Sequence, residues 1–131
     1  MGRIIAIANQ KGGVGKTTTA INLSACLAES GQKVLTVDFD PQGNATSGLG
    51  IETGEIDKTV YDLLVGECDI EECLISNMQE NMDLLPSNVD LAGDEIELLE
   101  IENKEALLKT YLSKIKNNYD FIIIDCPTSL N

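Results

Sequence analysis

Short runs of apolar residues along this chain predict its strands. Residues 3–9 contain Ile-Ile-Ala-Ile-Ala, residues 33–37 contain Val-Leu-Thr-Val, and residues 121–124 read Phe-Ile-Ile-Ile. Uninterrupted apolar runs of this length are typical of strands buried on both faces, as in parallel sheets. Residues 82–85 predict one more strand, whereas Leu74-Ile75 is too short to assign.

Between these runs, apolar residues recur at helical spacing. Ile21, Ala25 and Ala28 predict a helix that begins at Thr17 and is closed by Gly31. The remaining predicted segments are a surface excursion with room for a short helix at residues 44–58, a helix capped by Thr59 through Leu64, and helical stripes at residues 92–99 and 107–115.

The alternation of strands and helices predicts the fold class. It favours an α/β protein with a doubly wound, mostly parallel sheet flanked by helices. In such sheets ligands bind beyond the carboxyl ends of the strands, so polar residues that follow a strand are the first candidates for a site. With 131 residues, the chain has room for one domain.

Composition and charge narrow the environment. The hydrophobic fraction is 43%, and no apolar run approaches the roughly 20 residues of a membrane-spanning helix. The apolar start is too short for a secretory signal, so we expect a cytoplasmic protein with no membrane partner. The net charge of −13 is concentrated in residues 52–105, which hold two Lys or Arg against seventeen Asp or Glu. This block predicts a solvated acidic face and argues against DNA binding by this segment.

The cysteine and histidine content restricts the chemistry. The four cysteines, Cys26, Cys68, Cys73 and Cys126, form no Cys-x-x-Cys motif, and the chain has no histidine, so the pattern does not fit a zinc site. Without a secretory signal, we expect reduced thiols buried as small hydrophobic side chains. A Ser-His-Asp or Cys-His mechanism is excluded, so any general base must be a carboxylate.

A glycine-rich loop stands between the first predicted strand and the first predicted helix. Its sequence, Lys-Gly-Gly-Val-Gly-Lys-Thr-Thr at residues 11–18, is a deviant Walker A pattern, because Gln10 occupies the place of the usual first glycine. The glycines allow the backbone to wrap a polyphosphate, and the amides and dipole at the helix start favour the anion. A tight turn without a ligand is the alternative, but Gly-Lys-Thr in this setting favours nucleotide binding.

This loop predicts a site for ATP or ADP with Mg²⁺. Lys16 would neutralise the β- and γ-phosphates, and the Thr17 hydroxyl would bind Mg²⁺. Lys11 would stabilise charge in the transition state, unless it simply points to solvent. The predicted nucleotide-binding residues are Lys11, Gly12, Gly13, Val14, Gly15, Lys16, Thr17 and Thr18.

Three carboxylates follow predicted strands and belong on the same side. Asp125 after four apolar residues matches a Walker B arrangement that holds Mg²⁺ directly or through water; the alternative is a cap of the following turn. Asp38 would support the waters of the metal, and Asp40 would orient the attacking water. An Asx-turn before Pro41 is the alternative for these two, and it is compatible with function.

Together, residues 11–18, Val37-Asp-Phe-Asp-Pro-Gln-Gly-Asn44 and Asp125-Cys-Pro127 resemble the ParA/Soj partitioning ATPases, relatives of MinD. Residues 60–64, 85–88 and 90–93 also resemble this family, so the similarity spans nearly the whole chain. The resemblance implies a P-loop NTPase of which residues 1–131 are the N-terminal part of one domain, truncated after the Walker B strand. Adenine-contacting and basic DNA-binding segments would follow in relatives.

The resemblance also implies a mechanism. The expected protein is a cytoplasmic, nucleoid-associated ATPase that dimerises with MgATP, binds DNA non-specifically through a later region, and acts in chromosome or plasmid segregation. A ParB/Spo0J-type protein would stimulate its turnover. By the same resemblance Lys11 crosses to the partner's phosphates, Gly12 allows the dimer to close, and Lys16 is the Walker A lysine. Thr17 and Asp125 form the magnesium shell, and Asp40 positions water.

Three alternatives remain open from the sequence. A MinD-like membrane-associated cell-division ATPase would need an amphipathic C-terminal helix. An iron–sulfur carrier ATPase with the same loop would need Cys126 or Cys73 as thiolate ligands. A third is that this segment keeps the phosphate-binding loop but hydrolyses nothing.

Overall fold

The computed structural model describes residues 3–7, 14–39, 44–51, 56, 58–64, 66–87 and 104–126, with only the backbone described at residues 14–17, 44, 104 and 105. Within these ranges no helix is both long and apolar enough to cross a membrane. The elements, in chain order, are β1 (Arg3–Ile7), α1 (Val14–Glu29), β2 (Val34–Asp38), α2 (Asn44–Gly48), α3 (Val60–Leu64), α4 (Ile70–Cys73), β3 (Ile75–Gln79), β4 (Met82–Leu85), α6 (Lys104–Ser113), η2 (Lys116–Asn118) and β5 (Phe121–Asp125).

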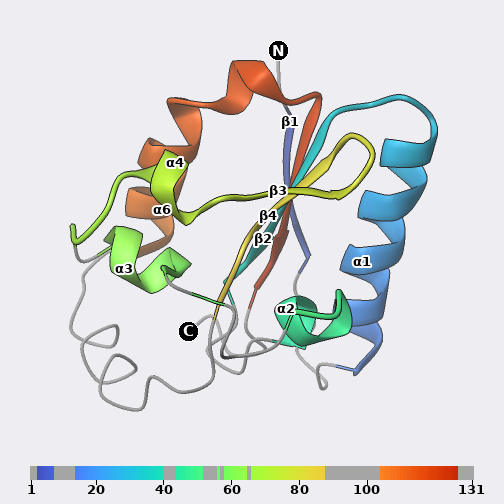
Figure 1. Ribbon diagram of the computed structural model, residues 1–131, viewed down its shortest axis with the longest axis horizontal. Helices are drawn as coiled ribbons and strands as arrows, with labels where there is room; N and C mark the ends of the chain where they lie inside the picture. Colours follow the sequence, from blue (N-terminus) through green and yellow to red (C-terminus); the bar gives the residue numbers. More distant parts are fainter. Residues whose placement is uncertain are drawn as a thin grey trace.

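One five-stranded sheet forms the centre of the molecule (Figure 1). Its order is β1-β5-β2-β4-β3, and every neighbouring pair is parallel except β3 with β4. The four strands predicted from apolar runs are confirmed, and so is the mostly parallel α/β class. The burial expected on both faces is found in β2 and β5 but not in β1, which is an edge strand whose residues are exposed or half-buried. β3 has no apolar run, because it is a partly exposed edge strand whose polar residues form a hairpin with β4.

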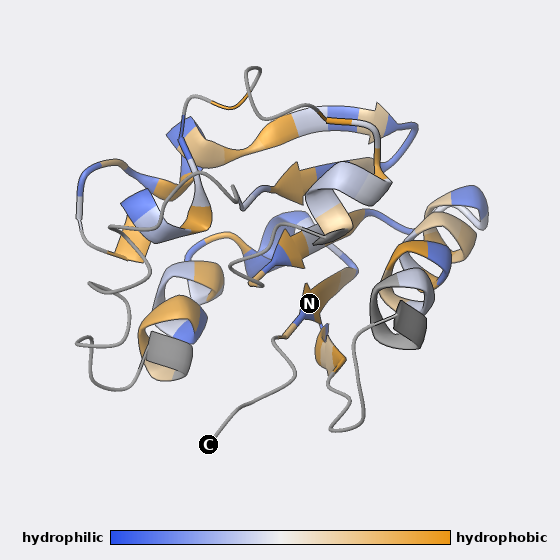
Figure 2. Ribbon diagram, turned by 90° about the horizontal axis from the view of Figure 1, so that it is seen from below, coloured by the Kyte–Doolittle hydropathy of each residue, from blue (hydrophilic) through white to orange (hydrophobic). Residues whose placement is uncertain are grey.

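Helices cover both faces of the sheet, as Figure 2 shows from below. α1 packs on one face over a core cluster that includes Ala20, Val34 and Ile123. The other face carries a larger cluster with α3, α4 and α6, to which Leu35 and Val37 belong. Successive residues of a strand point to opposite faces, so each central strand must be apolar at nearly every position.

The helices agree with the periodicity, with one shift in bounds. α1 begins at Val14, three residues before the predicted start, so the end of the glycine loop is already helical. Its last turn closes as predicted at Gly31, which has φ +93° and donates its amide to Ala28. In α6, Leu108 and Leu112 are buried as expected. The predicted stripe at residues 92–99 lies outside the described residues.

The short helix that the sequence allowed within residues 44–58 is present as α2, but the segment is not wholly on the surface. Ala45 and Thr46 of α2 are 0% and 2% exposed, and α2 packs against α1. Close approach explains Gly48, because a Cβ at this position would lie 2.6 Å from the Cδ1 atom of Ile21. Small residues therefore serve tight packing here rather than solvation.

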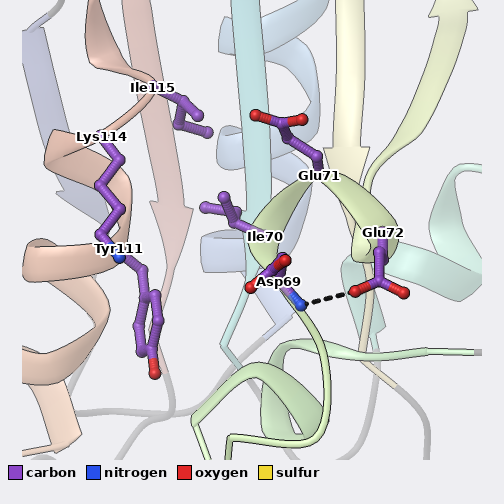
Figure 3. Close-up of a pocket in the computed structure, with 7 residues that line it drawn as sticks. All are labelled: Asp69, Ile70, Glu71, Glu72, Tyr111, Lys114 and Ile115. Atoms are coloured by element: carbon purple, nitrogen blue, oxygen red, sulfur yellow. Dashed lines mark hydrogen bonds between the residues drawn. The ribbon is translucent and has the colours of Figure 1, made fainter.

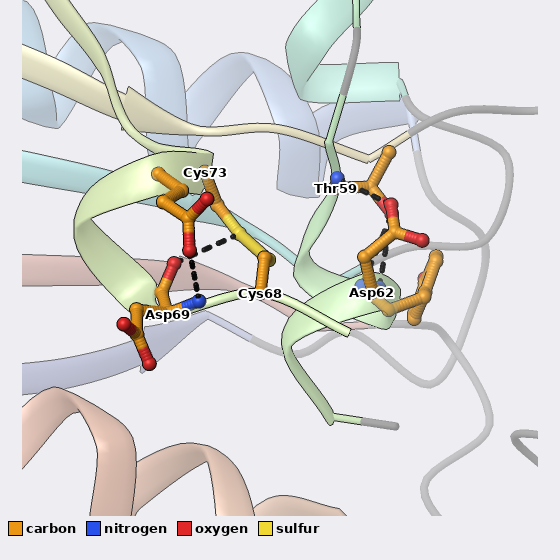
Figure 4. The surroundings of a disulfide bond; sticks show 7 residues. Thr59, Asp62, Cys68, Asp69 and Cys73 are labelled. Atoms are coloured by element: carbon orange, nitrogen blue, oxygen red, sulfur yellow. Dashed lines mark hydrogen bonds between the residues drawn. A yellow bond between two sulfur atoms is a disulfide. The ribbon is translucent and has the colours of Figure 1, made fainter. Parts of the chain in front are cut away.

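Cys68 and Cys73 form a disulfide (Figure 4). The expectation of reduced thiols is wrong for this pair. The cysteines are five positions apart, and the single turn of α4 returns the chain so that both side chains enter the larger core cluster. Cys26 is exposed, Cys126 is buried, and neither is joined to another cysteine. The iron–sulfur alternative needed Cys73 or Cys126 as a thiolate ligand, and Cys73 is bonded to Cys68 instead.

Candidate functional site

The carboxyl ends of the four parallel strands meet at one edge of the sheet. In the strand register, Ile7 is the Cα partner of Asp125, and Asp125 is the partner of Asp38. Backbone hydrogen bonds continue beyond the strands, since the Phe39 amide donates to the Asp125 carbonyl and the Cys126 amide to the Ile7 carbonyl, both at 3.0 Å. The register therefore brings together two of the predicted metal-binding residues.

Both carboxylates at this edge are buried, since Asp38 and Asp125 are each 0% exposed. Neighbouring strands lie about 4.8 Å apart, so two negative groups share a small region of reduced dielectric, which favours a nearby cation. Among the described residues, no group of three or more His, Cys, Asp or Glu side chains could hold a metal by itself. One or two carboxylates plus phosphate oxygens is the donor set that Mg²⁺ commonly uses, so the residues fit that ion.

Asp38 is held in place by α2. Its Oδ2 atom accepts hydrogen bonds from the Thr46 amide at 2.9 Å and from the Thr46 hydroxyl at 2.6 Å. The Thr46 hydroxyl oxygen in turn accepts from the Ser87 amide at 3.0 Å, beyond the end of β4. Thr46 was not predicted from the sequence, because a threonine among Gly, Thr and Ser has no periodicity that marks it as buried.

The start of α1 lies after the glycine loop predicted to bind phosphate. α1 follows the glycine loop that leaves β1, and its first turn contains the backbone of residues 14–17. The unpaired amides and dipole at a helix N-terminus attract phosphate. Thr18 is exposed on this helix. The predicted site residues Lys11, Gly12, Gly13 and Asp40, and the side chains of Val14, Lys16 and Thr17, lie outside the described residues.

A separate groove lies between α4 and α6, on the face of the sheet opposite α1 (Figure 3). It encloses about 310 Å³, and its walls carry Asp69, Glu71 and Glu72 on one side and Tyr111 and Lys114 on the other. Glu72 accepts a hydrogen bond from the Asp69 amide at 3.0 Å, across the first turn of α4. Glu72, one of the acidic residues in the segment 52–105, therefore stabilises the start of α4.

The carboxyl edge thus combines a helix that starts after a glycine loop with two buried acids on adjacent parallel strands. This combination defines the class of P-loop nucleotide-binding proteins. A family model described as an AAA domain matches residues 2–131. The chain belongs to this family, and its curated relatives include Soj and ParA proteins.

Two curated relatives illustrate the similarity. The sporulation initiation inhibitor protein Soj of Bacillus subtilis is 57% identical over 130 residues, which are 99% of this chain and 51% of Soj. The chromosome-partitioning ATPase Soj of Treponema pallidum is 51% identical, over 99% of this chain and 50% of that protein. The chain therefore spans about half the length of the curated relatives it matches.

A solved structure shares the fold. Cobyrinic acid a,c-diamide synthase from Mycobacterium smegmatis, solved with a bound ATP analogue and magnesium, superimposes with a TM-score of 0.88 and 44% sequence identity. The match covers 100% of this chain and 53% of that one. The likeness extends over every strand and helix described above.

Proposed function

We propose that this chain is the nucleotide-binding part of a ParA/Soj-type ATPase that binds MgATP and hydrolyses it to ADP. The observation that carries the proposal is the pair of buried carboxylates, Asp38 and Asp125, in register beside the start of α1. The Mycobacterium smegmatis structure with an ATP analogue and magnesium supports it, because a protein with this fold accommodates both.

Each predicted residue has a distinct task in this proposal. The backbone amides of Gly12, Gly13, Val14, Gly15 and Thr18 surround the phosphates, and the Lys16 ammonium group neutralises the β- and γ-phosphate oxygens. Bound Mg²⁺ would supply charge neutralisation on those oxygens. Thr17 and Asp125 would hold the ion, and Asp38 would hold one of its waters.

Turnover depends on two further side chains in the proposal. Asp40 orients the attacking water, since a carboxylate is the base type left in a chain without histidine. Lys11 stabilises negative charge that develops on the transferred phosphoryl group. Lys11 would act on the nucleotide of a second copy, so hydrolysis would accompany ATP-dependent dimerisation.

The activity of the whole protein follows from the same proposal. The dimer would bind DNA non-specifically through a region outside these residues, act at the nucleoid in the cytoplasm, and serve chromosome or plasmid segregation. A ParB/Spo0J-type activator would accelerate hydrolysis. The name of the Treponema pallidum relative, a chromosome-partitioning ATPase, supports partitioning rather than another use of the phosphate loop.

Equilibrium binding of a fluorescent ATP analogue with Mg²⁺ tests the proposal, using protein expressed from its complete gene. Lys16→Ala should weaken binding by about 10- to 150-fold, because a charge-assisted contact with the phosphates is worth roughly 1.5–3 kcal/mol. Lys33→Ala is the matched control, since Lys33 is exposed at the opposite end of β2. Equal affinity in wild type and Lys16→Ala would refute the assignment.

Steady-state hydrolysis separates binding from chemistry. Asp40→Ala should leave the affinity for MgATP within about threefold of wild type and lower kcat by a factor of roughly 100 or more, as expected for loss of a positioned base. Recruitment by anionic lipid vesicles, rather than stimulation by DNA, would instead indicate the MinD-like alternative.

A further inference from the structure

Thr46 makes three hydrogen bonds at the carboxyl edge, and the proposed function uses none of them. Its amide and hydroxyl both donate to Asp38 Oδ2, and its hydroxyl oxygen accepts from the Ser87 amide. The side chain is 2% exposed and Ser87 is 1% exposed, so solvent does not compete at either contact. Three elements that are distant in the sequence, β2, α2 and the end of β4, therefore meet at one hydroxyl group.

The direction of these hydrogen bonds is determined by chemistry. A backbone N–H can only donate, so the Thr46 oxygen must accept from Ser87. A hydroxyl has a single hydrogen, which is then committed to the Asp38 carboxylate at 2.6 Å. The short distance is typical of a charge-assisted O–H···O⁻ bond. Ser87 thereby orients Thr46, and Thr46 orients Asp38.

We propose that Thr46 is a positioning residue for the Mg²⁺–nucleotide site. Two donors on Oδ2 restrict the plane of the Asp38 carboxylate beside Asp125. This orientation would allow the carboxylate to accept from a water bound to Mg²⁺. The proposal rests on the proposed function, because it assigns Thr46 to the same cation site. Partners that orient a ligand of this kind commonly change metal affinity or activity by about 10- to 100-fold when they are removed.

Thr46→Val tests this step. Valine keeps the side-chain shape and the backbone amide, and it removes only the hydroxyl. Binding of a non-hydrolysable fluorescent ATP analogue is measured across a Mg²⁺ titration and in excess chelator, on protein expressed from its complete gene. We expect the half-saturating Mg²⁺ concentration to rise about tenfold, with the metal-free affinity unchanged. Thr46→Ser, which restores the hydroxyl, should return it to within about twofold of wild type.

Thr36→Val is the matched control, because it removes a buried threonine hydroxyl from β2, two residues before Asp38. It should leave the Mg²⁺ titration unchanged. If Thr46→Val lowers the melting temperature but also leaves the Mg²⁺ titration unchanged, the residue is only structural and the proposal is overturned. If Thr46→Val does not fold, Thr46→Cys gives the same test, since its thiol is only a weak donor. A rise in the half-saturating Mg²⁺ concentration relative to wild type then supports the proposal, and an unchanged titration overturns it.

The outcomes separate this proposal from the proposed function. Wild type that binds no nucleotide at any Mg²⁺ concentration would refute both. Wild type that binds MgATP, with Thr46→Val, Thr46→Ser and Thr36→Val all equal to it, would refute only the role of Thr46.

Discussion

Replacing Tyr119 with phenylalanine should destabilise the protein without affecting its nucleotide site. The Tyr119 hydroxyl donates to Asp83 Oδ2 at 2.6 Å, and Asp83 Oδ1 accepts from the Asn77 amide at 2.9 Å. The tyrosine is only 8% exposed. This pair ties the chain just before β5 to β4, at the amino end of the parallel strands, and the link to Asn77 extends it to β3.

The expected loss can be estimated from the type of bond removed. Phenylalanine keeps the buried ring, so the hydrophobic contribution is retained and only the hydroxyl is lost. A hydrogen bond to a charged acceptor contributes about 1.5–3 kcal/mol. That is a substantial part of the roughly 5–15 kcal/mol by which small domains are stable. At about 4 °C per kcal/mol for a chain of this size, the melting temperature should fall by roughly 6–12 °C.

Alkaline pH should reveal the same bond. Burial, the hydrogen bond to Asp83 and the negative charge of that carboxylate raise the pKa of Tyr119 above its usual value near 10. Above about pH 10 the unfolded chain loses this proton while the folded chain keeps it, so stability falls as pH rises. Below pH 10 the contribution of Tyr119 is fully present. Tyr119→Phe should lack this part of the alkaline decline.

Urea unfolding at pH 7 and at several values above pH 9 measures both effects. Tyr111→Phe is the control, because Tyr111 lies partly exposed on α6 with its ring under the Lys114 ammonium group. It should change stability by less than about 0.5 kcal/mol. A Tyr119→Phe variant as stable as wild type, with the same alkaline decline, would refute the reasoning. MgATP affinity should be unchanged, since six residues of extended chain separate Tyr119 from Asp125, about 20 Å.

Two smaller changes test other parts of the fold by thermal or urea unfolding. Thr36→Val should raise the free energy of unfolding by about 1 kcal/mol, because the Thr36 hydroxyl is fully buried with no hydrogen-bond partner among the described residues; a loss of stability would mean that this hydroxyl is bonded. Thr59→Ala should lower it by about 1 kcal/mol, because Thr59 accepts from the amides of Tyr61 and Asp62 at the start of α3. Figure 4 shows Thr59 beside Asp62. Thr59→Ser should restore most of that loss.

Several features of this protein could be derived from its sequence alone. The uninterrupted apolar runs that became β2 and β5 require burial on both faces, and only a sheet covered by helices on both sides provides it. The similar run of β1 lies at the edge of the sheet, where its residues are exposed or half-buried. The glycine loop before α1, and Asp38 and Asp125 after apolar runs, predicted a site at the carboxyl edge, because parallel strands end at the same side. These patterns involve residues that are close together in the sequence, so they predict structure without knowledge of the fold.

Features that depend on contacts between distant residues were determined only by the tertiary structure. β3 is a strand because β4 pairs with it, despite its polar sequence. Thr46 is buried because Asp38 and Ser87 converge on it from two other elements. Cys68 and Cys73 are bonded because the turn of α4 brings them together. In each case a residue acquires its role from partners elsewhere in the chain, and the energy of those contacts outweighs the preference of its own sequence neighbours.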